Sequence, residues 1–176
     1  MKVFNSLDPT EKPSILMVVY GEGGVGKTTF AATAPRPIIA DCENGSKYFG
    51  LRGIAADVAL IEKWDDMQEF MQIALTEDYD TVIIDPIGEL MEKLIAYMRN
   101  RADSKLVQRD GNPTMAGWGW LKSTMRNFLK TMRDSGKHIV IVAHVQETMM
   151  AELLNVRWSP QDYLRNWSTW WTSSVT

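Results

Sequence analysis

Residues 21–28 read Gly21-Glu22-Gly23-Gly24-Val25-Gly26-Lys27-Thr28, and they fit the pattern G-x-x-x-x-G-K-[ST]. The apolar run at 14–20 is typical of a buried strand, and residues 29–34 read as the start of a helix. Between a strand and a helix, glycines let backbone N–H groups face phosphate oxygens, and the helix N-terminus adds positive potential. This context predicts a loop that holds the phosphates of a nucleoside triphosphate, in preference to a solvated glycine-rich turn.

The side chains of this loop have separate expected roles. Lys27 can reach the β- and γ-phosphates, and Thr28 can place its hydroxyl on Mg²⁺. ATP and Mg²⁺ are therefore the expected ligands. The positions expected to contact the nucleotide are Gly21, Glu22, Gly23, Gly24, Val25, Gly26, Lys27, Thr28 and Thr29.

Composition narrows the class of protein. A chain of 176 residues that is 45% hydrophobic suits one domain with a full core, and its net charge of −3 gives no general attraction to nucleic acid. No stretch approaches the about 20 apolar residues of a membrane span, and the first residues are too polar for a signal peptide. The single cysteine, Cys42, favours a reducing compartment, so we expect a cytoplasmic protein without membrane contact.

Strand-like and helix-like segments alternate along the chain. Asp65 is expected to cap one helix, whose apolar residues recur at helical spacing. The alternation predicts an α/β fold in which a mainly parallel sheet is flanked by helices in three layers, with ligands at the carboxyl ends of the strands. Beyond the first strand, strands are expected at 38–41, 58–61, 81–85 and 138–143.

Carboxylates follow two of these strands. Asp85 ends the run Thr81-Val82-Ile83-Ile84 and is expected to hold Mg²⁺ through water beside Thr28, although it could instead cap the next turn. Glu43 is the candidate for orienting the attacking water and accepting its proton. Asp41 competes for that role, and either acid could simply solvate a loop. Lys27, Glu43 and Asp85 are thus the candidate catalytic residues.

Two further groups of residues are candidates, one for sensing the γ-phosphate and one for binding nucleic acid. His144 and Gln146 follow an apolar strand, where they could sense the γ-phosphate or serve a structural role. Cations interleaved with aromatic rings near 101–118 suit a single nucleic-acid strand, although a solvated loop with core tryptophans is favoured by composition alone. The candidate DNA contacts are Arg101, Lys105, Arg109 and Trp118.

In their order along the chain, these motifs resemble the RecA-like core of P-loop ATPases over roughly residues 14–150. The resemblance is closest to phage nucleotide-binding proteins of the AAA-type group, which includes RecA-like single-strand-annealing ATPases. It implies Mg²⁺-dependent ATP hydrolysis, assembly into a ring or filament, and action on single-stranded DNA in recombination or annealing. It also implies the cytoplasm of a bacterial host, if the chain is encoded by a phage.

The same resemblance suggests where the functions lie. It places the catalytic glutamate on Glu43, a sensor amide near His144 or Gln146, and DNA-binding loops at about 101–117 and 147–160. Partition and septum-positioning ATPases are a second reading, but Glu22 replaces the first lysine of their loop. A nucleotide-gated partner switch with negligible turnover and a small-molecule kinase are further alternatives.

The chain divides into three expected parts: a polar lead-in at 1–13, the ATPase domain at 14–157 and an atypical tail at 158–176. The tail holds four of the seven tryptophans and has neither helical nor strand periodicity. Read in a shifted codon frame, residues 167–176 would resemble the closing strand that the family implies. We interpret the tail as frameshifted or truncated, the alternative being a genuine Trp-rich segment that docks on a partner or stacks on bases.

Overall fold

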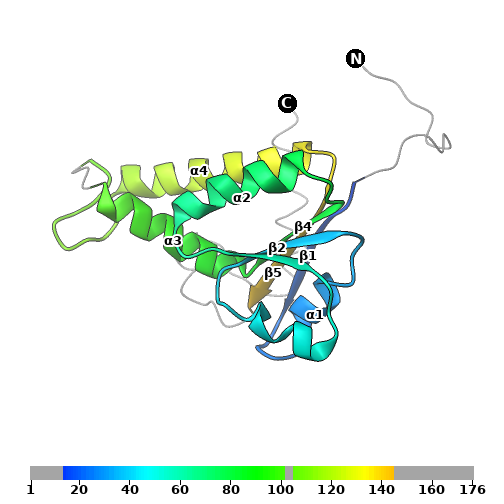
Figure 1. Cartoon of the computed structure of the whole chain (residues 1–176). Coiled ribbons are helices and arrows are strands. Elements are labelled where there is room, and N and C mark those ends of the chain that lie inside the picture. The colour runs from blue at the N-terminus through cyan, green and yellow to red at the C-terminus, as the bar shows by residue number, and fades with distance from the viewer. Residues whose placement is uncertain (1–13, 102–104, 145–176) are drawn as a thin grey trace, which may run out of the picture.

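The computed structural model describes residues 14–101 and 105–144. Within them, a five-stranded parallel sheet has the order β1-β5-β4-β2-β3. Figure 1 shows the sheet between two layers of helices, which confirms the expected three-layer α/β arrangement. The strands are β1 (Leu16–Gly21), β2 (Pro37–Asp41), β3 (Asp57–Leu60), β4 (Thr81–Asp85) and β5 (His138–His144).

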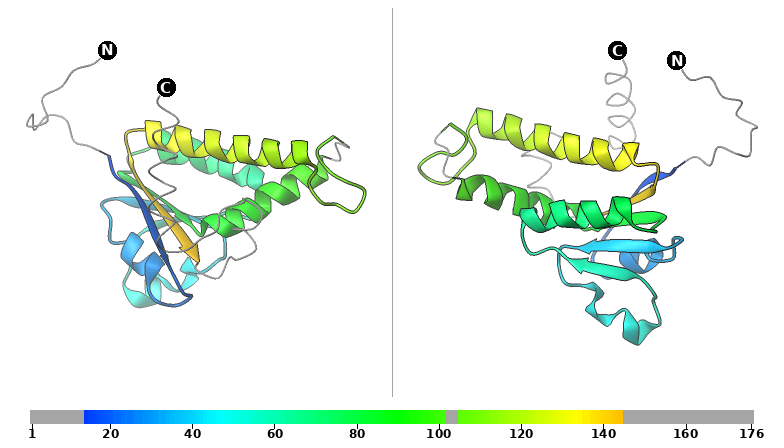
Figure 2. Two further views of the ribbon diagram at one scale, coloured as in Figure 1. Left: turned by 180° about the vertical axis from the view of Figure 1, so that it is seen from behind. Right: turned by 45° about the horizontal axis from the view of Figure 1, so that its top comes forward.

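The helices cover the two faces of the sheet unequally. The long helices lie together on one face, and the short helix with two 3₁₀ turns lies on the other (Figure 2). The long helices are α2 (Trp64–Thr76), α3 (Ile87–Asn100) and α4 (Met115–Asp134). The opposite layer consists of α1 (Lys27–Ala31) and the turns Ser46–Tyr48 and Gly50–Arg52.

The central strands are buried on both faces, which explains their unbroken apolar sequence. In β4, Val82 and Ile84 join the larger apolar cluster beneath α2, α3 and α4, whereas Ile83 joins the smaller cluster with Ala31 of α1. All three β4 side chains are 0% exposed. Apolar side chains at helical spacing face the larger cluster from each long helix: Met67, Phe70 and Ala74 of α2, Leu90, Leu94 and Met98 of α3, and Leu121, Met125, Phe128 and Met132 of α4.

The start of α2 differs from the expectation. The helix begins at Trp64, and the Asp66 carboxylate accepts hydrogen bonds from the backbone N–H groups of Glu62 (3.0 Å) and Lys63 (2.9 Å). The prediction that Asp65 caps this helix was wrong. The N-cap is Lys63, so the helix starts two residues earlier than an Asp65 cap would give, and the stabilising carboxylate is Asp66 at its third position.

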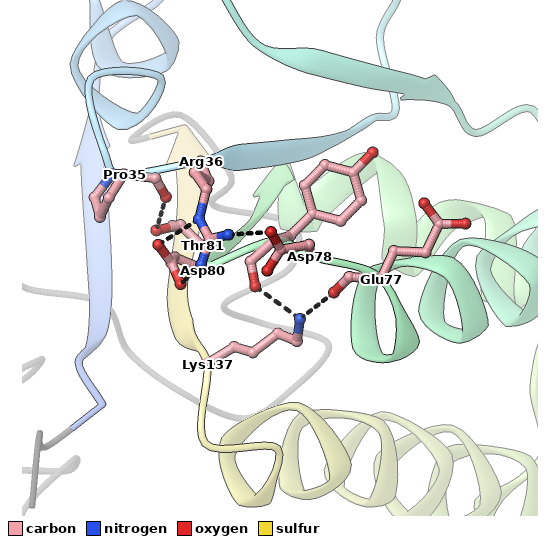
Figure 3. Close-up of polar contacts among 8 residues, drawn as sticks. Pro35, Arg36, Glu77, Asp78, Asp80, Thr81 and Lys137 are labelled. Carbon is pink, nitrogen blue, oxygen red and sulfur yellow. Dashed lines mark hydrogen bonds and ion pairs between the residues drawn. The ribbon is translucent and has the colours of Figure 1, made fainter.

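Polar contacts fasten the amino ends of the central strands (Figure 3). Arg36 pairs with Asp78 and also with Asp80, where its Nε lies 2.8 Å from Oδ2. The Lys137 ammonium donates to the carbonyl oxygens of Glu77 (2.8 Å) and Tyr79 (2.7 Å). These bonds tie the turn between α2 and β4 to the starts of β2 and β5, at the edge opposite the strands' carboxyl ends.

Several expectations concern residues outside the described ranges. These are Gln146, the lead-in at 1–13, the suggested loop at 147–160 and the tail at 158–176. The frameshift interpretation of the tail therefore stays a prediction.

In the described part, β1 pairs only with β5 and forms one edge of the sheet, where Ile15 and Met17 are exposed. None of the helices described is long and apolar enough to cross a membrane.

Candidate functional site

The registers of the parallel strands bring the candidate residues together. Gly21, the last residue of β1, lies beside His144 at the end of β5, and Asp41 of β2 lies beside Asp85 of β4. β5 and β4 are neighbours in the sheet, so all four positions lie along its carboxyl edge. The order of the strands therefore assembles the site from segments more than 100 residues apart.

A cavity of about 170 Å³ lies at this edge. Its walls include Lys27 and Thr28 after β1, Glu43 after β2, Asp85 after β4 and His144 after β5. Thr29, Gly24 and Gly26 also line it, together with Gly45, Phe49 and Pro86, which the sequence analysis had not singled out. A larger surface hollow of about 580 Å³ between α2 and α4 gathers no comparable set of groups.

The glycines of the loop are required by its backbone. Gly24 has a φ of 77° and Gly26 a φ of 94°, in the left-handed region where a side chain is strained. Val25 between them is exposed, and Gly26 leads directly into α1 at Lys27. The backbone thus turns sharply enough at these two glycines for the loop to line the cavity.

Lys27 is buried and bonded to its own loop. Its ammonium donates to the carbonyl oxygens of Gly21 (2.9 Å) and Glu22 (2.8 Å), and lies 3.3 Å from Nδ1 of His144. The side chain is 7% exposed. A lysine held in this way lies in the wall of the cavity and can turn toward an anion that enters it.

Thr28 and Asp85 form a second contact within the cavity. The Thr28 side chain is hydrogen-bonded to the Asp85 carboxyl. Burial raises the pKa of Asp85 above its ordinary value, and the nearby charges of Asp41 and Glu43 add to this, more than offsetting the Thr28 bond and the proximity of His144. A divalent cation would favour the ionised carboxylate, so this buried acid suits a metal ligand.

Asp41 is fully engaged in shaping the turn after β2. Its carboxylate accepts hydrogen bonds from the backbone N–H groups of Glu43 (3.1 Å), Gly45 (3.2 Å) and Ser46 (2.9 Å), and from the Ser46 hydroxyl. Burial alone would raise the pKa of Asp41, but these bonds outweigh it and hold the pKa below its ordinary value. Asp41 is 4% exposed, whereas the Glu43 side chain is 44% exposed and reaches the cavity.

Replacing Asp41 with asparagine is expected to destabilise the fold by about 1.5–3 kcal/mol at pH 7, because hydrogen bonds to an ionised acceptor are lost. The folded-state pKa of Asp41 is lowered, so its contribution is present above the unfolded-state value of about 3.9 and disappears as the pH falls through the folded-state value. Urea unfolding of wild type and Asp41→Asn at pH 7 and pH 3 measures the contribution of Asp41 to the free energy of unfolding. A stability difference between wild type and Asp41→Asn that is equally large at pH 3 would contradict the assignment.

The candidate DNA residues lie away from the cavity. The loop that joins α3 to α4 projects beyond the sheet, at the far end of the helical layer from α1 (Figure 1). Lys105 and Arg109 are exposed there, and the Arg101 guanidinium lies over the Tyr97 ring at 5.7 Å. Trp118 is half-buried against the larger apolar cluster, with less ring surface open than the sequence suggested.

Comparison with known protein families identifies the domain that contains this site. Residues 14–159 match the model of a family described as an AAA domain, which covers every described residue of the site. No curated protein matches the chain. Among residues 14–101 and 105–144, no cluster of three or more His, Cys, Asp or Glu side chains could hold a metal by itself.

Proposed function

The chain belongs to the AAA-domain family, and we propose that it is an Mg²⁺-dependent ATPase of the RecA-like type. The observation that carries the proposal is the convergence of Lys27, Glu43 and Asp85 on one cavity at the carboxyl edge of the sheet. Phosphoryl transfer requires little covalent chemistry from a protein and depends on positioning and on compensating charge. A lysine, a water-orienting acid and a metal-holding acid are the parts that it needs.

The charges of the cavity support a role for Mg²⁺. Three carboxylates, Asp41, Glu43 and Asp85, line it against one cation, Lys27. A polyphosphate would be repelled by this set unless a divalent cation entered with it. Thr28 and Asp85 are the residues that would hold the ion, and the bound ion would neutralise charge on the phosphate oxygens.

Glu43 is the acid that we assign to the attacking water. Asp41 uses its oxygens on four donors of the turn that follows it, so it has little capacity left for a water molecule. Glu43 is two residues further on, and its exposed carboxylate lines the cavity. It can accept the proton that the water loses as the γ-phosphate is attacked.

Phosphate release from ATP tests this function. We expect turnover by the purified chain that requires Mg²⁺ and disappears on chelation with EDTA. Tight binding of ATP without measurable turnover would instead favour the nucleotide-gated partner switch. Absence of both binding and turnover in the folded protein would refute the proposal.

We further propose single-stranded DNA as the partner, in phage-type recombination or annealing by a ring or filament of identical chains. Charge is segregated in the sequence: residues 99–133 hold eight Lys and Arg against two Asp, in a chain whose net charge is −3. Four of these cations recur every three or four residues along α4 and are exposed, so they share one face of the helix. This basic stripe consists of Lys122, Arg126, Lys130 and Arg133.

Reversing two charges of the basic stripe is expected to weaken DNA binding. Lys122→Glu with Lys130→Glu should lower the affinity for an oligo-dT strand at least about 10-fold at low salt and reduce the salt dependence of binding. Lys47→Glu with Lys63→Glu is the control, because it changes the net charge equally at exposed positions outside the stripe. Fluorescence anisotropy measures both. An equal loss of DNA affinity in the two double variants would indicate a non-specific effect of net charge and would contradict a DNA surface on α4.

A further inference from the structure

His144 lies between the two charged residues that the proposed function assigns to opposite ends of the reaction. Its Nδ1 is 3.3 Å from the Lys27 ammonium, and its Nε2 is 3.4 Å from Oε1 of Glu43. The histidine ends β5, whose preceding residues are buried at the centre of the sheet. Its backbone pairs with Gly21 of β1 in the sheet, whereas Glu43 lies in the turn after β2.

The contact with Lys27 favours one tautomer of the His144 ring. An ammonium group has donors only, so Nδ1 must accept from it, and the proton of the neutral ring is then on Nε2. That N–H is on the side of the Glu43 carboxylate. The distance of 3.4 Å is longer than an ordinary N–H···O hydrogen bond and is that of an ion-pair contact between the two side chains.

The Glu43 carboxylate has few other means of being held in place. Its own backbone N–H is bound by Asp41, which fixes the main chain and leaves the side chain free to rotate. Within residues 14–101 and 105–144, His144 is the one side chain that the structure places in polar contact with that carboxylate. Effective acceptance of a proton from a positioned water requires the carboxylate to stay in one orientation.

We propose that His144 is a positioning residue for Glu43, with its Nε2 facing the carboxylate. The proposal rests on the assignment of Glu43 as the proton acceptor in ATP hydrolysis. It differs from direct sensing of the γ-phosphate, since the histidine acts through the glutamate. It also connects Lys27, which binds phosphate, to the acid that activates water.

Three substitutions separate the two ring nitrogens. The amide of His144→Gln can place a donor near Nε2, whereas His144→Asn can reproduce only an acceptor near Nδ1, and His144→Phe keeps the ring shape without either. We expect Phe and Asn to lower kcat by about 10-fold or more with KM changed little, as for loss of a group that orients a reacting residue. Gln is expected to recover most of the lost kcat. Thermal melts identify any variant that fails to fold. If one of the three fails, the kcat values of the other two variants, compared with wild type, test the proposal.

A double-mutant cycle distinguishes this role from a structural one. If His144 acts through Glu43, His144→Phe should lower turnover strongly in wild type and have little further effect in Glu43→Gln. An equal loss in both backgrounds, or wild-type kcat in His144→Phe, would overturn the inference while leaving the ATPase assignment intact. A wild-type chain without Mg²⁺-dependent turnover would overturn the proposed function itself, and this inference with it.

Discussion

Replacement of Lys27 with alanine is expected to abolish tight ATP binding and to reduce turnover below detection, while the domain stays folded. The lysine is the cation that lines the cavity alongside three carboxylates, so its loss removes the protein's main attraction for the β- and γ-phosphates. The two carbonyl oxygens that it binds belong to Gly21, at the end of β1, and to Glu22 of the loop, outside the two apolar clusters. The effect should therefore fall on binding and catalysis, with little change in stability.

Titration with a fluorescent ATP analogue, phosphate release and a circular-dichroism melt measure the three properties separately. Lys27→Met is the matched variant, because methionine keeps most of the side-chain length and removes only the charge. We expect Met to resemble Ala in nucleotide binding. ATP affinity and turnover close to wild type in either folded variant would show that the loop does not bind phosphate in the way proposed.

The phosphate loop could be recognised from the sequence because its determinants are local. Gly24 and Gly26 supply the left-handed turns and Lys27 begins the helix, so a fixed spacing encodes the whole feature. Asp85 was recognisable for a similar reason, since three apolar residues immediately before an acid indicate a buried strand that ends at a sheet edge. The alternation of strands and helices then predicted the layers, although the start of α2 required knowledge of where Trp64 is buried.

The choice between the two acids after β2 could not be made from the sequence. Asp41 and Glu43 are two residues apart with similar neighbours, and what separates them is the turn through Gly45 and Ser46 that directs its N–H groups at Asp41. The contact of His144 with Lys27 was equally inaccessible, because it joins residues 117 positions apart. Such contacts depend on the strand order, which the apolar pattern does not specify.

The tryptophans near the α3–α4 loop illustrate the opposite case. Trp118 precedes Leu121 by three residues, so helical spacing alone places it near the core face, and the structure has it packed there. Trp120 stacks on Tyr97 with ring centroids 6.4 Å apart. The interleaving of cations and rings had suggested stacking on bases, whereas composition alone had favoured core tryptophans, in agreement with the packing of Trp118 and Trp120.

Glu43→Gln is expected to bind ATP with nearly wild-type affinity and to hydrolyse it at least about 10²-fold more slowly. The amide keeps the size of the side chain and removes the group that accepts a proton from water. Because the carboxylate is 44% exposed, its replacement should leave the melting temperature almost unchanged. Single-turnover phosphate release, with ATP binding measured in parallel, separates a slow chemical step from weak binding.

Asp41→Asn provides the contrast that makes this assignment decisive. We expect it to lose stability through the turn that Asp41 fixes, but to retain turnover within about 10-fold when activity is expressed per folded molecule at a temperature well below its melting point. The two substitutions would then have separate effects: Glu43→Gln would lower the rate of hydrolysis, and Asp41→Asn would lower the stability of the fold. Wild-type turnover in Glu43→Gln together with a catalytically dead but folded Asp41→Asn would exchange their roles. In that case the four hydrogen bonds to Asp41 would position a catalytic base, and the contact between His144 and Glu43 would lose its part in the reaction.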